Sequence, residues 1–193
     1  EMDCILDLAN KYDIAVIEDA AQAHLCTYNN RLAGTFGNIG CFSFHETKNL
    51  QCGEGGAIFI NDKALQERAE YVREKGTNRS KFWRGEVNKY EWIDVGSSYL
   101  PSELNAAFLL AQLENAEMIT QNRLTSWDIY YRDLQPLNEK GYIDLPFIPK
   151  VCKHNGHMFY IKVKDLEERT KLLAYLKENI KVWLHDCFGD ICN

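Results

Sequence analysis

The part of the chain that decides the fold reads VIEDAAQA at residues 16–23, and CFSFHETKN follows at residues 41–49. Each stretch opens on apolar residues of the kind found in a buried strand, and each then turns polar. In open α/β sheets, functional side chains gather where the strands end. The two stretches therefore predict neighbouring strands that carry a polar site at their ends.

The surrounding pattern predicts an α/β layout. We expect a helix over residues 2–11, apolar strands over 14–17, 39–44 and 57–60, and a further helix. That last helix would begin at a capping Asn61 or Asp62 and run to about residue 75.

The later part of the chain predicts a second, smaller domain. Residues 78–95 are irregular, aromatic and charged, as in a loop that packs over something. A long helix should open at residues 101–103 and run to about residue 134, because Pro136 would end it. A strand over 158–163 and a helix capped by Asp165 follow. We place the domain boundary so that residues 1–125 are part of a large domain and 126–193 are a partial α+β domain.

Composition narrows the class of protein. The 193 residues carry a net charge of −6, which argues against nucleic acid because phosphate-backbone binding needs a basic surface. No run approaches the ~20 apolar residues that span a bilayer, so we expect no membrane segment. Seven cysteines without a CxxC spacing favour a reducing cytoplasm. The chain opens directly on a helical pattern, and we expect it to be cut from something longer.

The polar residues after the two strands form a coherent chemical set. Asp19 and Gln22 follow the first strand, and Ser43 and Lys48 follow the second. A lysine amine can bind a carbonyl covalently, a buried carboxylate can keep a pyridinium nitrogen protonated, and a hydroxyl can donate to phosphate. The glycine run at residues 53–56 lets backbone come close, since glycine has no Cβ. Each feature alone is common, and only their conjunction in this order is informative.

These motifs resemble the DegT/DnrJ/EryC1/StrS family of sugar aminotransferases. The resemblance runs from residue 1 to about residue 180. Residues 73–79 (REKGTNR) and 96–104 (GSSYLPSEL) are similar to the branch that aminates a dTDP-linked keto-sugar to dTDP-4-amino-4,6-dideoxygalactose. Members are about twice as long, so the resemblance implies a chain truncated at both ends. It also implies part of a fold-type-I large domain with a mainly parallel sheet, then an incomplete small domain.

The resemblance implies pyridoxal 5′-phosphate as cofactor and assigns roles to individual residues. Lys48 would bind the cofactor covalently and move the proton. Asp19 would pair with the ring nitrogen, Gln22 with the phenolic oxygen and Ser43 with the phosphate. Ser98 stands where many members have an asparagine that reaches the neighbouring subunit's cofactor, and it would make one hydrogen bond there.

Four further residues are candidates for substrate contacts, and no metal site is predicted. They are His45, Arg79, Trp83 and Tyr99. His45 has an equally good interpretation as a loop histidine with a structural hydrogen bond. The aromatic residues around Trp83 have an equally good interpretation as part of a subunit interface.

The predicted activity is glutamate-dependent transamination of a dTDP-4-keto-6-deoxyhexose. Its product would enter a cell-surface polysaccharide such as lipopolysaccharide or enterobacterial common antigen, and the resemblance implies a homodimer. Two alternatives stay open: a different keto-sugar or a cyclitol as substrate, or a catalytically silent remnant. The remnant is favoured by the missing N-terminal half and by residues 182–193, which depart from the family.

Overall fold

The computed structural model describes residues 1–179, and these fall into two compact units. The first unit comprises Glu1–Ser126 and Ile148–His157, and the second comprises Trp127–Phe147 and the residues from Met158 on. The segment Ile148–His157 thus belongs with the first unit, although it comes after part of the second. The boundary expected between residues 125 and 126 stays a prediction.

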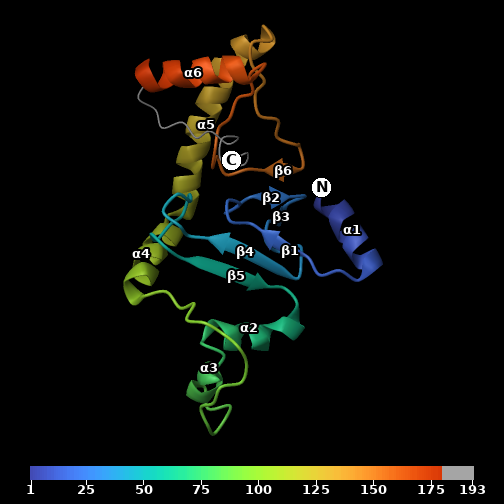
Figure 1. Ribbon diagram of the computed structural model, residues 1–193, viewed down its shortest axis with the longest axis vertical. Coiled ribbons are helices and arrows are strands. Elements are labelled where there is room, and N and C mark those ends of the chain that lie inside the picture. The colour runs from blue at the N-terminus through green and yellow to red at the C-terminus, as the bar shows by residue number, and fades with distance from the viewer. Residues whose placement is uncertain (180–193) are drawn as a thin grey trace. The chain divides into compact units, whose positions relative to one another are not determined.

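A three-stranded sheet organises the first unit (Figure 1), with the strand order β1 (Ile17–Asp19), β4 (Ile39–Ser43), β5 (Gly56–Ile60). β1 and β4 are parallel with Asp19 opposite Cys41, whereas β4 and β5 are antiparallel. The expected α/β class is confirmed. Because β1 and β4 are parallel, their carboxyl ends, which carry Asp19 and Ser43, meet at the same edge of the sheet.

A second sheet is antiparallel and brings a distant segment beside the first loops. Its order is β3 (Arg31–Leu32), β2 (Thr27–Tyr28), β6 (Cys152–Lys153). The pairing of β2 with β6 places the residues that follow β6 next to the loop between β1 and β2.

The first unit has helices where the sequence predicts them, and also a short helix, α3, inside residues 78–95, which were expected to be irregular throughout. They are α1 (Met2–Tyr12), the 3₁₀ turn η1 (Lys63–Leu65), α2 (Gln66–Arg73), α3 (Arg79–Trp83) and α4 (Glu103–Glu114). The Asp62 carboxylate accepts from the Ala64 amide at 2.9 Å, and the Ser102 hydroxyl accepts from Asn105 at 3.2 Å. Both are N-terminal caps that satisfy otherwise unpaired amides.

The second unit contains the rest of α5 (Ala116–Glu139), the bridge between Asp144 and Lys162, and α6 (Leu166–Asn179). Trp127 packs edge-on against Phe159 at 5.2 Å between ring centroids, and its indole donates to the Met158 carbonyl at 3.2 Å. The Asp165 side chain accepts from the Glu168 amide at 2.9 Å, so the predicted cap of α6 is confirmed.

Three details differ from the sequence-based expectations. The first strand is Ile17–Asp19 rather than 14–17, because the Ile14 amide still closes α1 by donating to the Ala9 carbonyl at 2.9 Å. Ile17 is 66% exposed in this chain, so the expectation of a buried strand is wrong for this residue. Residues 158–163 contribute a single bridge instead of a strand.

The predicted long helix is two helices, α4 and α5, which meet at Asn115, and Pro136 does not end α5. α5 continues past Pro136 to Glu139, although a proline inside a helix removes one backbone hydrogen bond. The prediction for residues 182–193 lies outside the described residues.

A small core lies directly under the loop that follows β4. Phe44, Leu50 and Cys52 are at most 8% exposed and pack with Leu109, Ala116 and Ile119. Lys48 is thus flanked in sequence by two buried anchors, Phe44 and Leu50. Both ends of the loop around it are therefore held by buried residues, while Glu46 and Thr47 are exposed.

Candidate active site

Two adjacent carboxylates at the end of β1 have different surroundings. Glu18 accepts from the backbone amides of Gly34 at 2.8 Å, Phe36 at 2.5 Å and Gly37 at 2.7 Å. Asp19 is exposed, and within residues 1–179 the one bond its side chain accepts is local, from the Ala21 amide at 3.1 Å. Successive strand residues point to opposite faces, so Glu18 is used to hold a turn while Asp19 is left available.

Backbone and hydroxyl hydrogen bonds define the loop from Ser43 to Lys48. The Ser43 hydroxyl accepts from the His45 amide at 3.2 Å, and the Lys48 amide donates to the His45 carbonyl at 2.9 Å. The Glu46 amide donates to Gly53 at 2.8 Å, which ties the loop to the glycine run. The Lys48 side chain is half-buried.

His45 makes contacts within its own loop. Its Nδ1 lies 3.0 Å from the Thr47 hydroxyl and accepts from the Thr47 amide at 3.2 Å. Its Nε2 lies 3.7 Å from the Glu54 carboxylate. These contacts favour the structural interpretation of His45, and its role toward substrate stays a prediction.

Two histidines, the buried His24 and the half-buried His157, are influenced by the charge of Lys48. Burial lowers the pKa of His24, and the positive charge of Lys48 lowers it further. Burial also lowers the pKa of His157, with additional contributions from the charges of Arg123 and Lys48. Both imidazoles therefore stay neutral near pH 7, and His24 Nε2 lies 2.8 Å from the Ser43 carbonyl.

Gln22 is exposed, and its backbone carbonyl accepts from the side chain of Asn155 at 2.9 Å. The structure thus brings Asp19, Ser43, Lys48 and the neighbourhood of Gln22 to one end of the sheet.

The sequence did not predict a role for His24, Asn49 or Asn155. No spacing rule points to a contact between residues more than a hundred positions apart, so only the fold could reveal them.

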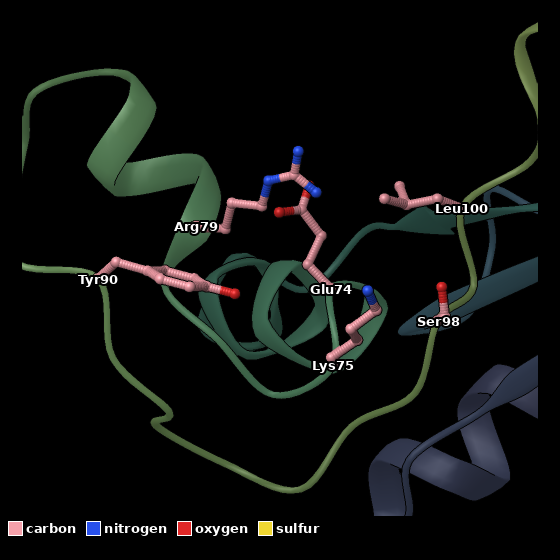
Figure 2. Close-up of a pocket in the computed structure, with 6 residues that line it drawn as sticks. All are labelled: Glu74, Lys75, Arg79, Tyr90, Ser98 and Leu100. Atoms are coloured by element: carbon pink, nitrogen blue, oxygen red, sulfur yellow. The ribbon is translucent and has the colours of Figure 1, made fainter.

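Two of the other predicted residues, Arg79 and Ser98, line a small pocket elsewhere in the first unit, whereas Trp83 and Tyr99 are not part of its lining. Figure 2 shows Arg79 at the start of α3, Tyr90 on the loop after it, and Ser98 with Leu100 across the pocket. Glu74 and Lys75 complete the lining of a cavity of about 20 Å³, which is room for about one water molecule. Trp83 and Tyr99 are 73% and 66% exposed. As it stands, this pocket does not hold a sugar.

The residues at the sheet edge fit pyridoxal phosphate by their chemistry. They offer an amine, an available carboxylate, a side-chain amide and a hydroxyl, which are the groups that this cofactor needs around its aldehyde, ring nitrogen, phenolic oxygen and phosphate. The described residues contain no cluster of three or more side chains suited to a metal ion. None of the helices in that part of the chain is both long and apolar enough to cross a membrane.

Comparison with known proteins identifies the family. The model of the DegT/DnrJ/EryC1/StrS aminotransferase family matches residues 1–192. The chain belongs to this family. DegT/DnrJ/EryC1/StrS proteins are pyridoxal-phosphate-dependent aminotransferases.

Relatives of this family member include aminotransferases named for nucleotide-linked sugars and one named for a cyclitol. UDP-4-amino-4-deoxy-L-arabinose–oxoglutarate aminotransferase of Shewanella sediminis is 35% identical over 96% of this chain and 49% of its own length. dTDP-3-amino-3,6-dideoxy-alpha-D-galactopyranose transaminase of Aneurinibacillus thermoaerophilus is 33% identical over 96% of this chain and 47% of its own. L-glutamine:2-deoxy-scyllo-inosose aminotransferase of Micromonospora echinospora is 40% identical over 59% of this chain and 28% of its own.

Solved structures agree on the fold. A DegT/DnrJ/EryC1/StrS aminotransferase from Brucella abortus superposes with a TM-score of 0.77 at 27% identity, over 92% of this chain and 44% of that one. The large-domain portion is therefore part of a fold-type-I aminotransferase, as expected. The chain spans about half the length of the first curated relatives that it matches.

Proposed function

We propose that the protein is a pyridoxal-phosphate-dependent aminotransferase that converts a nucleotide-linked keto-sugar to the amino sugar. The observation that carries this proposal is the shared sheet edge, where the parallel pairing of β1 and β4 brings Asp19 and the Lys48 loop together. We further propose dTDP-4-keto-6-deoxyhexose as substrate and glutamate as amino donor.

Each residue at the edge has a task in this reaction. Pyridoxal phosphate, when bound, supplies an electron sink for the carbon that loses its proton. The Lys48 amine would hold the aldehyde end and then carry a proton between the two carbon atoms concerned. The Asp19 carboxylate would hold a proton on the ring nitrogen, and Gln22 and Ser43 would orient the ring and the phosphate by hydrogen bonds.

The choice of substrate rests on the relatives. Two of them act on sugars linked to UDP or dTDP, and one acts on a cyclitol, 2-deoxy-scyllo-inosose. The first two match nearly the whole of this chain, whereas the cyclitol enzyme matches 59% of it. A nucleotide-linked sugar is therefore the favoured substrate, and a cyclitol or another keto-sugar is the second candidate. The amino sugar formed from this substrate would be incorporated into a cell-surface polysaccharide.

We also propose a homodimer in a reducing cytoplasm. Ser98, on the exposed segment after α3, would reach the neighbouring subunit's cofactor, while Arg79, Trp83 and Tyr99 would contact substrate. The cysteines among the described residues are free thiols, as a reducing compartment requires.

The test is amino transfer by the full chain loaded with pyridoxal phosphate. Glutamate is the donor, and a dTDP-4-keto-6-deoxyhexose, a UDP-4-ketopentose and 2-deoxy-scyllo-inosose are compared as acceptors. Mass spectrometry of the products should show the dTDP amino sugar with the highest kcat/KM. A preference for the cyclitol would replace the substrate proposal. No transfer to any acceptor would favour the silent remnant.

A further inference from the structure

A set of buried amides connects the two loops of the candidate site. Asn155 is 3% exposed, and its side-chain amide donates to the carbonyls of Gln22 and His24, both at 2.9 Å. Its side-chain oxygen accepts from the His157 amide at 3.1 Å. Both donor hydrogens and the acceptor of this side chain are therefore in use.

Asn49 continues the connection to the lysine. It follows Lys48 directly, is 5% exposed, and donates to the Asn155 carbonyl at 3.1 Å. Its side-chain oxygen lies 2.7 Å from His157 Nδ1. The loop after β1 is thus bonded to Asn155, and the loop after β4 is bonded to Asn155 and to His157 two residues on.

The segment that joins the loops is itself held in place. Arg123 of α5 donates to the His157 carbonyl at 3.0 Å. Gly156 has φ +62, and a Cβ there would lie 3.0 Å from the Arg123 backbone. The backbone packs this closely only because glycine has no side chain. The backbone that carries Asn155 and His157 is therefore held in place by α5.

We propose that Asn155 is a positioning residue that sets the place of Lys48 and Gln22 relative to each other. It acts through Asn49 and the Gln22 carbonyl and does not itself contact reacting atoms. The proposal rests on the aminotransferase function proposed above, since only there does the placement of these two side chains matter. Aspartate in its place would lose both donors and bury a negative charge, so an amide is required.

The first test needs no cofactor. We compare amide hydrogen exchange in the full chain and in Asn155→Asp, following the amides of Ala23 and Lys48, which are bonded to Ala20 and His45. Both should exchange at least tenfold faster in the variant, while the β4–β5 ladder is unchanged. Asn155→Ser, which keeps one donor, should be intermediate and serves as the readout if Asn155→Asp fails to fold.

Asn78→Asp is the matched control. Asn78 is also 5% exposed and bonds backbone groups, the Lys89 carbonyl at 3.0 Å and the Glu91 amide at 2.8 Å, but it lies in another loop. It should loosen only that loop. Unchanged exchange at Ala23 and Lys48 in both Asn155 variants, or an equal change in Asn78→Asp, would overturn the proposal.

The second test separates positioning from the proposed function. Pyridoxal phosphate is added, trapped with borohydride, and the labelled lysines are located by mass spectrometry. Wild type should carry the label mainly on Lys48, and Asn155→Asp should show at least a fivefold smaller share there, with more label on exposed lysines such as Lys63. An equal fraction of the label on Lys48 in wild type and variant would contradict the positioning role of Asn155 and leave the proposed function standing. The absence of label on wild-type Lys48 would contradict the proposed function. Hydrogen exchange would then still show whether Asn155 holds the two loops together.

Discussion

At the scale of single residues, Glu18 and Asp19 form a natural pair for experiment because they are adjacent but differently engaged. Asp19→Asn should weaken pyridoxal phosphate binding about 10- to 100-fold, the equivalent of one lost charged hydrogen bond of roughly 1.5–3 kcal/mol. Its unfolding midpoint should stay near that of wild type. Glu18→Gln should lower the unfolding midpoint and leave cofactor affinity unchanged, since Glu18 accepts from three backbone amides. Titration of the cofactor and thermal unfolding of both variants check this, and equal cofactor affinity in the two would contradict it.

His24 predicts a pH dependence of stability. Its folded-state pKa is lowered by burial and by Lys48 from an ordinary value of 6.5. Below that value the unfolded chain binds a proton more readily than the folded chain does, so stability is full above it and falls as the pH drops toward the lower folded pKa. His24→Gln should therefore lose less stability than wild type between pH 7.5 and pH 5.5 in urea unfolding. An acid loss as large as that of wild type would show that His24 is not the group concerned.

At the scale of elements, β4 depends on Gly40. A Cβ on Gly40 would lie 2.0 Å from the Gly34 carbonyl oxygen, and the clash is with backbone that cannot swing away. Gly40→Ala should destabilise the protein by several kcal/mol, in the range of severe core substitutions. Gly53→Ala is the control, because a Cβ there meets nothing and only the positive φ of 81° is strained, at about 1–2 kcal/mol. Denaturant unfolding of both variants should rank them in this order, and equal costs would contradict the close approach.

The elements also show what the sequence could predict. Local signals placed α1, β4, β5 and the caps at Asp62 and Asp165 correctly, because capping and apolar periodicity are properties of neighbouring residues. The break at Asn115 and the late start of β1 were not predicted; the latter follows from the Ile14 amide, which closes α1. The roles of Asp19 and Lys48 were proposed from their order along the chain together with the family resemblance, and they stay predictions. The support given by Asn49 and Asn155 was not predicted, since it joins residues that only folding brings together.

At the scale of the whole molecule, the first unit exposes much apolar surface. Val95 is 86% exposed, Leu104 83%, and Ile17 and Ile58 on the outer strands of the sheet 66% and 55%. Exposed apolar residues beside open strand edges promote association. We expect the chain to self-associate at tens of micromolar and to bind a hydrophobic dye, and Leu104→Glu to reduce both. Sedimentation velocity and dye fluorescence measure this, and a monodisperse monomer without dye binding would contradict it.

The central claim is that Lys48 holds pyridoxal phosphate in this chain. The most direct measurement is the absorbance spectrum of the purified chain mixed with the cofactor, beside that of Lys48→Ala. We predict a band near the visible edge in wild type that is absent from Lys48→Ala, and bleaching of that band when glutamate is added. A wild-type spectrum without the band, or the same band in Lys48→Ala, would contradict the claim.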